Sequence, residues 1–176
     1  MVVSESHRGY DLLAPVYGRL KKLVFGDKLR VASRSFLDTI EEGQSVLIIG
    51  GGDGELLEDL ANCGKHPNIV YVDASEKMIE KAGRRAPEGL IIEYILAHYQ
   101  HYNFTKSFDV IITPFFLDLF EGIELERIID KATRNLKPKG IWLVADFQRT
   151  GKLRHLFLEK LMYLFFLKKV RVILSG

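Results

Sequence analysis

Four glycines lie close together where a run of aliphatic side chains ends and a helical pattern begins. The stretch reads "VLIIGGGDGELLEDL" (46–60), and its glycines are Gly50, Gly51, Gly52 and Gly54. A chain that turns sharply from a strand into a helix needs positive φ or close approach to a ligand, and a Cβ obstructs both. The amides that open the helix carry partial positive charge. The turn therefore suits an electron-rich ligand group, such as a carboxylate or a phosphate.

The spacing of these glycines distinguishes between nucleotide-like ligands. A dinucleotide fingerprint requires G-x-G-x-x-G. The sixth position is Glu55 when counted from Gly50, and Leu57 when counted from Gly52, so neither register fits. No G-x-x-x-x-G-K-[ST] is present either. A negative Glu55 near the helix start would repel a pyrophosphate and favours a zwitterionic or cationic ligand.

Alternating strand and helix patterns position this turn at the edge of a sheet. The expected strands are Ser45–Gly50, Asn68–Asp73, Leu90–Leu96, Phe108–Thr113 and Ile141–Asp146. The expected helices lie near 54–62, 75–84 and 122–136, and "LKPKG" (136–140) is expected to be a turn. Several strands lack polar alternation, which is typical of parallel strands covered on both faces. The order predicts a Rossmann-like, doubly wound α/β fold with a mostly parallel sheet, which binds ligands where the strand order reverses.

Composition places the chain among folded proteins without a nucleic-acid signature. With 176 residues, 47% hydrophobic and 27% charged, one domain is expected. The formal charge is +2, and the basic excess is confined to residues 147–176. We interpret that excess as a solvated face and expect no nucleic-acid partner. The lone Cys63 and the lack of a leader favour a cytoplasmic location, and no apolar run is long enough to span a membrane.

Two consecutive motifs carry a family resemblance. "VLIIGGGDG" followed by "VYVDASEKMIEKA" (70–82) resembles the first two motifs of class I S-adenosylmethionine-dependent methyltransferases. The resemblance implies S-adenosyl-L-methionine as the cofactor, with the glycine turn beneath its methionine part and Asp73 bonded to both ribose hydroxyls. A carboxylate offers suitable acceptors to a vicinal diol. The resemblance also places Ala74 and Met78 beside the ribose and adenine, although helix packing explains Met78 equally well.

The resemblance covers about residues 10–147. "FDVIITPFFLDLF" and "LKPKGIWLVADF" are similar to the family's fourth and fifth strands, and "YDLLAPVYGRLKKLVFG" is similar to the lid helix of ubiquinone and menaquinone biosynthetic methyltransferases. It implies that Tyr10 and Tyr17 close over the cofactor, with core packing as the alternative. We divide the domain 1–176 into a helical lid (1–43), a cofactor-binding core (44–147) and a C-terminal part (148–176).

The C-terminal part has room for one strand after a basic apolar helix near 151–167, where the family has a hairpin of two. We expect an incomplete hairpin. Val170–Leu174 is expected either to pair beside the fifth strand or to leave an edge that a second copy of the chain completes as a homodimer. The helix covers the sheet in our preferred interpretation, and contact with a membrane surface is the alternative.

Two departures from the family pattern change the expected cofactor contacts. Ile48 stands where the family often has Asp or Glu, so the carbonyls of Gly50 and Thr113 are the expected acceptors for the cofactor's amino group. Ala97-His98 stands where the family commonly has Gly-Asp. A neutral His98 ring can accept the bond from the adenine amino group, and a solvent-exposed loop histidine is the alternative.

No catalytic residue can be assigned from the sequence. Asp146, His98 and Asp118 are the candidates for accepting a proton from a phenol, hydroxyl or amine, and no metal site is expected. Helix capping or solvation is the preferred interpretation of Asp118 and an equal alternative for Asp146. Phe115, Phe116 and Phe120 suggest an apolar wall, although core packing explains them as well. We predict methyl transfer to a small metabolite, which an apolar wall of this kind would require to be aromatic or lipophilic. The alternatives are a cofactor-binding subunit without turnover and an aminopropyltransferase.

Overall fold

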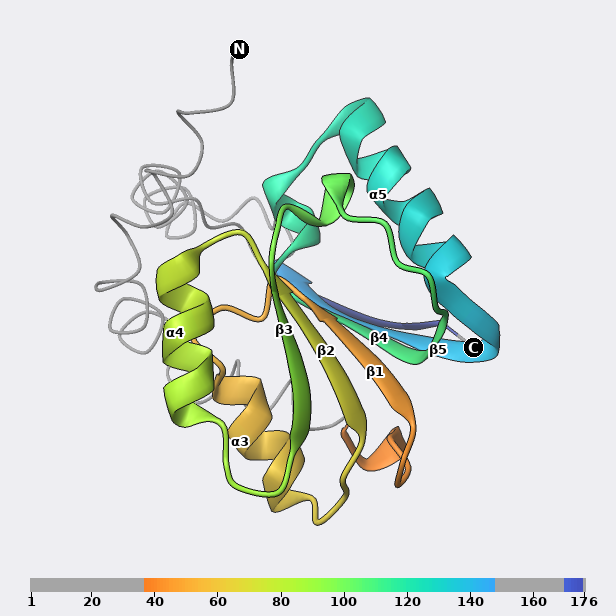
Figure 1. Cartoon of the computed structure of the whole chain (residues 1–176). Helices are drawn as coiled ribbons and strands as arrows, with labels where there is room; N and C mark the ends of the chain where they lie inside the picture. The colour runs from red at the N-terminus through yellow and green to blue at the C-terminus, as the bar shows by residue number, and fades with distance from the viewer. Residues whose placement is uncertain (1–36, 148–169, 176) are drawn as a thin grey trace, which may run out of the picture.

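The computed structural model describes residues 37–147 and 170–175 of the chain (Figure 1). The predicted lid with Tyr10 and Tyr17, and the predicted helix near 151–167, lie outside the described residues.

The described strands form one sheet with helices on both faces (Figure 1). The sheet order is β3-β2-β1-β4-β5-β6. β1 to β5 pair in parallel, and β6 is antiparallel to β5. The strands are β1 (Ser45–Ile49), β2 (Asn68–Asp73), β3 (Ile91–Leu96), β4 (Phe108–Pro114), β5 (Leu136–Phe147) and β6 (Val170–Ser175). The helices are α3 (Glu55–Asn62), α4 (Glu76–Arg85) and α5 (Gly122–Asn135), with short 3-10 turns η1 (Leu37–Thr39), η2 (Tyr99–His101) and η3 (Leu117–Leu119). The predicted doubly wound, mostly parallel fold is confirmed.

The two faces of β1 belong to two separate hydrophobic cores. Val46 and Ile48 pack with residues of α3 and α4 on one face. Leu47 and Ile49 pack with residues of α5 on the other. All four side chains are fully buried. The strand therefore needs apolar residues at each of the positions 46–49, which explains the absence of polar alternation in the sequence.

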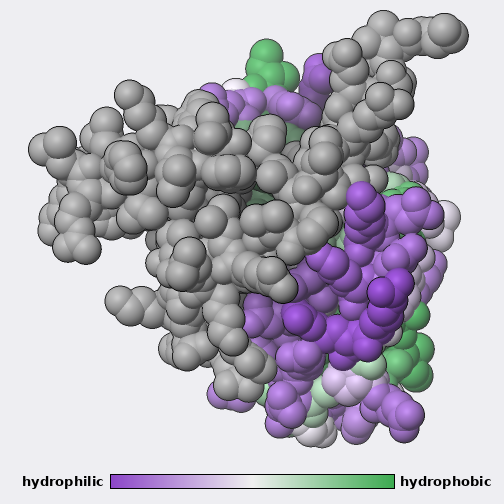
Figure 2. Space-filling model, turned by 90° about the vertical axis from the view of Figure 1, so that its left-hand side faces the viewer, coloured by the Kyte–Doolittle hydropathy of each residue, from purple (hydrophilic) through white to green (hydrophobic). Residues whose placement is uncertain are grey.

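The outer face of α4 is polar. Met78 and Ala82 are the buried residues of this helix, and its other positions are largely charged. An ion pair of 3.1 Å between Arg84 and Glu80 lies on the exposed side. Figure 2 views the molecule from the side on which α4 lies, and hydrophilic residues dominate the described surface there. This face of α4 is therefore a solvated surface.

The predicted turn at residues 136–140 is wrong, because the structure includes this segment in β5. Phe108 pairs with Leu136, and the next pair joins Val110 to Ile141, so β5 carries extra residues at an irregularity of the ladder. Lys139 takes a φ of 65° there. Pro138 has no N–H to donate to the ladder, as is typical of a bulged strand. The sequence signals for a turn and for a bulge are the same.

The last described strand completes one side of the sheet. In the antiparallel register, Trp142 of β5 pairs with Ser175 of β6, and Phe147 pairs with Val170 at the other end. The prediction that Val170–Leu174 pairs beside the fifth strand is confirmed. Homodimer formation through this edge stays a prediction.

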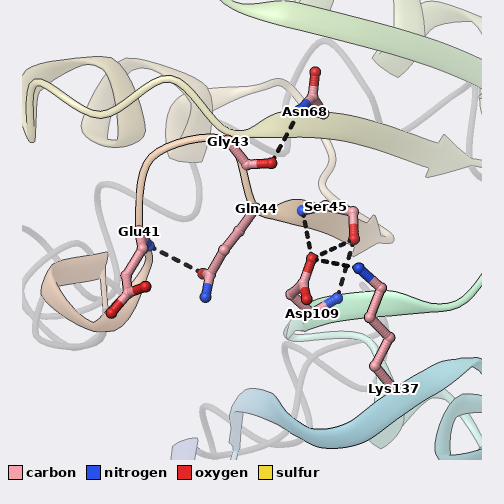
Figure 3. A network of polar contacts seen from close by, with 7 residues as sticks. All are labelled: Glu41, Gly43, Gln44, Ser45, Asn68, Asp109 and Lys137. Carbon is pink, nitrogen blue, oxygen red and sulfur yellow. Dashed lines mark hydrogen bonds and ion pairs between the residues drawn. The ribbon is translucent and has the colours of Figure 1, made fainter.

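A polar network joins three strands at the amino edge of the sheet (Figure 3). The Asp109 carboxylate accepts hydrogen bonds from the Ser45 N–H at 2.8 Å, the Ser45 hydroxyl at 2.6 Å and the Lys137 ammonium at 2.8 Å. Partial burial by itself raises the pKa of Asp109, but the bonds from Lys137 and Ser45 outweigh it and lower this pKa to about 2. The network fixes β1, β4 and β5 in register at this edge.

We expect Asp109→Asn to lower the free energy of unfolding by about 1–2 kcal/mol at neutral pH, a range reduced for the partial exposure of the carboxylate. The folded-state pKa of Asp109 lies below its ordinary value of 3.8. The stabilisation is therefore complete above about pH 4 to 5 and is lost as the pH falls toward 2. Urea unfolding of wild type, Asp109→Asn and the exposed-site control Asp130→Asn between pH 2 and 7 measures this. A wild-type advantage over Asp109→Asn that persists unchanged at pH 2 contradicts it.

Candidate cofactor site at the carboxyl edge of the sheet

The strand order reverses at β1, which pairs with β2 on one side and with β4 on the other. In open parallel sheets, ligands bind beyond the carboxyl ends of the strands at such a point. The glycine turn follows β1 there, Asp73 ends β2, and Thr113 and Pro114 end β4. The predicted cofactor residues of the described part thus come from segments that meet at one edge.

Three glycines of the turn adopt positive φ. The angle is 67° at Gly50, 67° at Gly52 and 84° at Gly54. Gly54 is also the residue that precedes α3, in the left-handed conformation. The predicted need for backbone that other residues rarely adopt is therefore observed.

The surroundings of each glycine show why a side chain is excluded. A Cβ at Gly50 would lie 2.6 Å from the Phe116 ring, and one at Gly51 would lie 2.4 Å from the Tyr71 hydroxyl. A Cβ at Gly54 would lie 2.6 Å from the Cα of Ala82 in α4. At Gly52 no atom of the described residues lies within 4 Å of the Cβ position. Three glycines therefore make room for other residues of the protein, and the Cβ side of Gly52 is open within the described part of the chain.

Asp73 is held by backbone N–H groups on both sides. Its Oδ2 accepts from the Gly52 N–H at 3.0 Å, and its Oδ1 accepts from the Ser75 N–H at 2.9 Å. The first bond joins the glycine turn to the end of β2, and the second joins Asp73 to the start of α4. Gly52 and Asp73, which belong to separate sequence motifs, are thus in direct contact.

The start of α4 lies beside Asp73. Ser75 is buried, and its hydroxyl accepts the Met78 N–H at 3.3 Å, which caps the helix. Met78 is buried, at 8% exposure, and Ala74 is partly exposed next to Asp73. Sequence analysis missed Ser75, although a serine three residues before an apolar helical position is the ordinary signal for a helix cap.

The end of β3 lies beside Asp73 as well. The Ala97 N–H donates to the Asp73 carbonyl at 3.0 Å, which places Ala97 and His98 at the same edge. His98 is partly exposed and precedes η2, with its ring centroid 6.1 Å from that of His101. A role for His98 toward a ligand stays a prediction.

The end of β4 is shaped by packing. Thr113 is fully buried, and its hydroxyl accepts from the Trp142 indole at 3.1 Å. Phe115 has a φ of 54°, and its N–H donates to the Ala145 carbonyl at 2.6 Å. A phenylalanine at positive φ is a rare and strained conformation. The Phe116 ring lies against Gly50, so the segment after β4 and the glycine turn are packed together.

The acid and base candidates are only partly placed. Asp118 lies in η3 and Asp146 in β5, but their side chains are outside those described. Among the described residues, no group of three His, Cys, Asp or Glu side chains is placed to hold a metal ion. Ile48 is buried in the core beneath the turn, so it offers no polar contact to a ligand.

The family of the chain follows from the segment that builds this edge. Residues 46–140, more than half of the chain, match a family model described as "Methyltransferase domain". The chain belongs to this methyltransferase family. The matched segment contains the glycine turn, Asp73, Ala97-His98 and the end of β4.

Curated relatives of this chain are of modest identity. A ubiquinone biosynthesis O-methyltransferase of Paramagnetospirillum magneticum is 28% identical over 113 residues, covering 63% of the chain and 43% of that protein. A demethylmenaquinone methyltransferase of Thermotoga maritima is 28% identical over 161 residues, covering 86% of the chain and 68% of that protein. The chain thus spans less than half the length of the first of these relatives.

A solved structure supports the fold of the methyltransferase. The complex of DhpI with SAH has a TM-score of 0.69 at 18% identity, and the match covers 80% of this chain and 66% of that one. At this identity the likeness establishes the fold.

Proposed function

We propose that this methyltransferase binds S-adenosyl-L-methionine at the carboxyl edge of β1 and β2 and transfers its methyl group to a small aromatic or lipophilic metabolite. The contact between Gly52 and Asp73 is the observation that carries the proposal. It brings the open position of the glycine turn to the carboxylate predicted to hold a ribose. Membership of the methyltransferase family supports it.

The residues of the edge fit such a cofactor. Gly52 has no Cβ, and the space where a Cβ would stand is open among the residues that the structure describes. The Asp73 carboxylate is fixed beside it by two N–H groups. A carboxylate has about four acceptor positions, so a diol can bond to one that already accepts from two N–H groups. Asp73 would hold the ribose, and Ala97, His98 and Met78 are proposed to border the adenine.

Methyl transfer requires the protein mainly to align the cofactor and the acceptor. The cofactor supplies an electrophilic methyl group on a sulfonium, and its transfer is an in-line displacement. The glycine turn and Asp73 would fix the nucleoside, and the surrounding segments would exclude water. If the acceptor loses a proton, His98, Asp118 and Asp146 remain the proposed bases.

The acceptor class rests on the relatives. Those reported above are named as a ubiquinone biosynthesis O-methyltransferase and a demethylmenaquinone methyltransferase, which supports a quinone-type or phenolic acceptor. The aromatic residues after β4 add little to this argument, because Phe115 and Phe116 are both only 8% exposed. Within the described residues, no helix is long and apolar enough to cross a membrane. A cytoplasmic location stays a prediction.

Mass spectrometry of methyl transfer tests the proposal. The purified full chain is incubated with S-adenosylmethionine and either a catechol or a demethylated quinol, and the products are analysed for the added methyl group. We expect methylation by wild type and by the surface control Asp130→Asn, and loss of most activity in Asp73→Ala. Cofactor binding without any methylated product would favour the binding-subunit alternative instead.

A further inference from the structure

Tyr71 of β2 lies directly beneath the glycine turn. Its side chain is fully buried, and its hydroxyl oxygen would be 2.4 Å from a Cβ at Gly51. The same hydroxyl donates to the Gly52 carbonyl at 3.0 Å. The Tyr71 phenol therefore occupies the space that a side chain at Gly51 would need.

The bond from Tyr71 reaches the residue that orients Asp73. Gly52 accepts from Tyr71 through its carbonyl and donates to Asp73 Oδ2 through its N–H. Gly52 has a φ of 67°, and no side chain of residues 37–147 or 170–175 packs within 4 Å of its Cβ position. These two hydrogen bonds therefore hold Gly52 at both ends.

The environment keeps the Tyr71 hydroxyl in its donor form. Burial raises the pKa of Tyr71 well above its ordinary value, and the negative charges of Asp73 and Asp53 raise it further. The phenol remains protonated at neutral pH and donates to the Gly52 carbonyl. An ionised oxygen there would face that carbonyl as a second acceptor and could not form the bond.

Tyr94 provides a matched comparison on the neighbouring strand. It pairs with Tyr71 in the sheet, and the two rings are 5.6 Å apart. The Tyr94 hydroxyl is buried and has no hydrogen-bond partner among the described residues. The two tyrosines thus differ in whether the hydroxyl reaches the glycine turn.

We propose that Tyr71 is a positioning residue of the cofactor site, which fixes Gly52 so that the Gly52 N–H orients the Asp73 carboxylate toward the ribose. The inference rests on the proposed function. It assigns a specific role to a residue that would otherwise count only as core. It gives the Tyr71 hydroxyl a role that a phenylalanine at this position could not have.

Paired Tyr→Phe variants test the inference. Calorimetric titration with S-adenosylhomocysteine is expected to give a Kd about fivefold higher for Tyr71→Phe, the loss of one hydrogen bond. Tyr94→Phe is expected to bind as wild type does. Thermal unfolding of both variants shows whether each is folded. Gly51→Ala, which places a methyl group where the Tyr71 hydroxyl lies, is a second route to displacing the phenol and is expected to weaken binding similarly.

A double-mutant cycle separates positioning from general loosening of the turn. Tyr71→Phe is expected to cost affinity in wild type and little in the Asp73→Ala background, because its effect passes through Asp73. An equal loss in both backgrounds overturns the inference, as does wild-type affinity in Tyr71→Phe. In those cases wild type still binds S-adenosylhomocysteine and the proposed function stands. Failure of wild type itself to bind rejects both.

Discussion

Replacing Asp73 with alanine is expected to weaken S-adenosylmethionine binding by about 1–3 kcal/mol. The variant loses the acceptors for the ribose diol. It also removes the oxygens that hold the N–H groups of Gly52 and Ser75, at 3.0 and 2.9 Å. Both effects act at the site and leave the hydrophobic cores unchanged. Isothermal titration calorimetry of wild type and variant measures the loss.

Two further variants sharpen the Asp73 experiment. Asp73→Asn keeps the shape but turns one acceptor into a donor, which must face either the Gly52 or the Ser75 N–H, so it is expected to lose affinity as well. Asp130→Asn makes the same chemical change on the exposed surface of α5 and is expected to bind as wild type does. Unchanged affinity in Asp73→Ala would remove this residue from the site.

Gly54→Ala is expected to lower the free energy of unfolding by about 2–4 kcal/mol, the largest effect on stability that we predict for a single methyl group. Part of the cost is strain, because Gly54 has a φ of 84°, and left-handed backbone costs a residue with a Cβ about 1–2 kcal/mol. The rest is overpacking, because the methyl group would lie 2.6 Å from the backbone of Ala82. Urea unfolding monitored by circular dichroism measures the sum.

Gly64→Ala is the matched control for this experiment. Gly64 also has a positive φ, 66°, but no atom of the described part of the chain lies within 4 Å of the position of its Cβ. It therefore isolates the strain term, and a loss of about 1 kcal/mol is expected. Equal losses of unfolding free energy in the two variants would show that overpacking against α4 adds nothing to the cost of Gly54→Ala.

The sheet was predictable from the sequence because parallel strands leave a strong signal. β1 and β2 are apolar at nearly every interior position, and both cores demand this, so their limits were predicted to within a residue. β5 was predicted less well. Lys137 to Gly140 carry proline and glycine, which signal a break in regular structure but do not distinguish a turn from a bulged strand.

The glycine turn was predicted correctly in conformation but only partly in its cause. The sequence argument attributed the missing side chains to backbone geometry and the approach of a ligand. The structure shows that Phe116, Tyr71 and Ala82 occupy the space beside three of the glycines. Such contacts join residues far apart in the chain, and a single sequence does not record which residues meet.

The supporting residues of the site were missed for the same reason. Tyr71 is one more large residue in the apolar β2 pattern, and its bond to Gly52 depends on how that loop folds back over the strand. The bond from Trp142 to Thr113 joins neighbouring strands and has no local signal. Asp73 was singled out through the resemblance of its motif, and its place at the end of a strand agrees with this; its bond to a ribose stays a prediction.

Calorimetric titration of the purified chain with S-adenosylmethionine and S-adenosylhomocysteine, beside NADH and ATP, tests the central claim most directly. We predict saturable binding of the two adenosyl compounds at one site per chain, and no comparable binding of NADH or ATP. A lack of heat and of thermal shift with both adenosyl compounds, together with binding of NADH or ATP, would contradict the account.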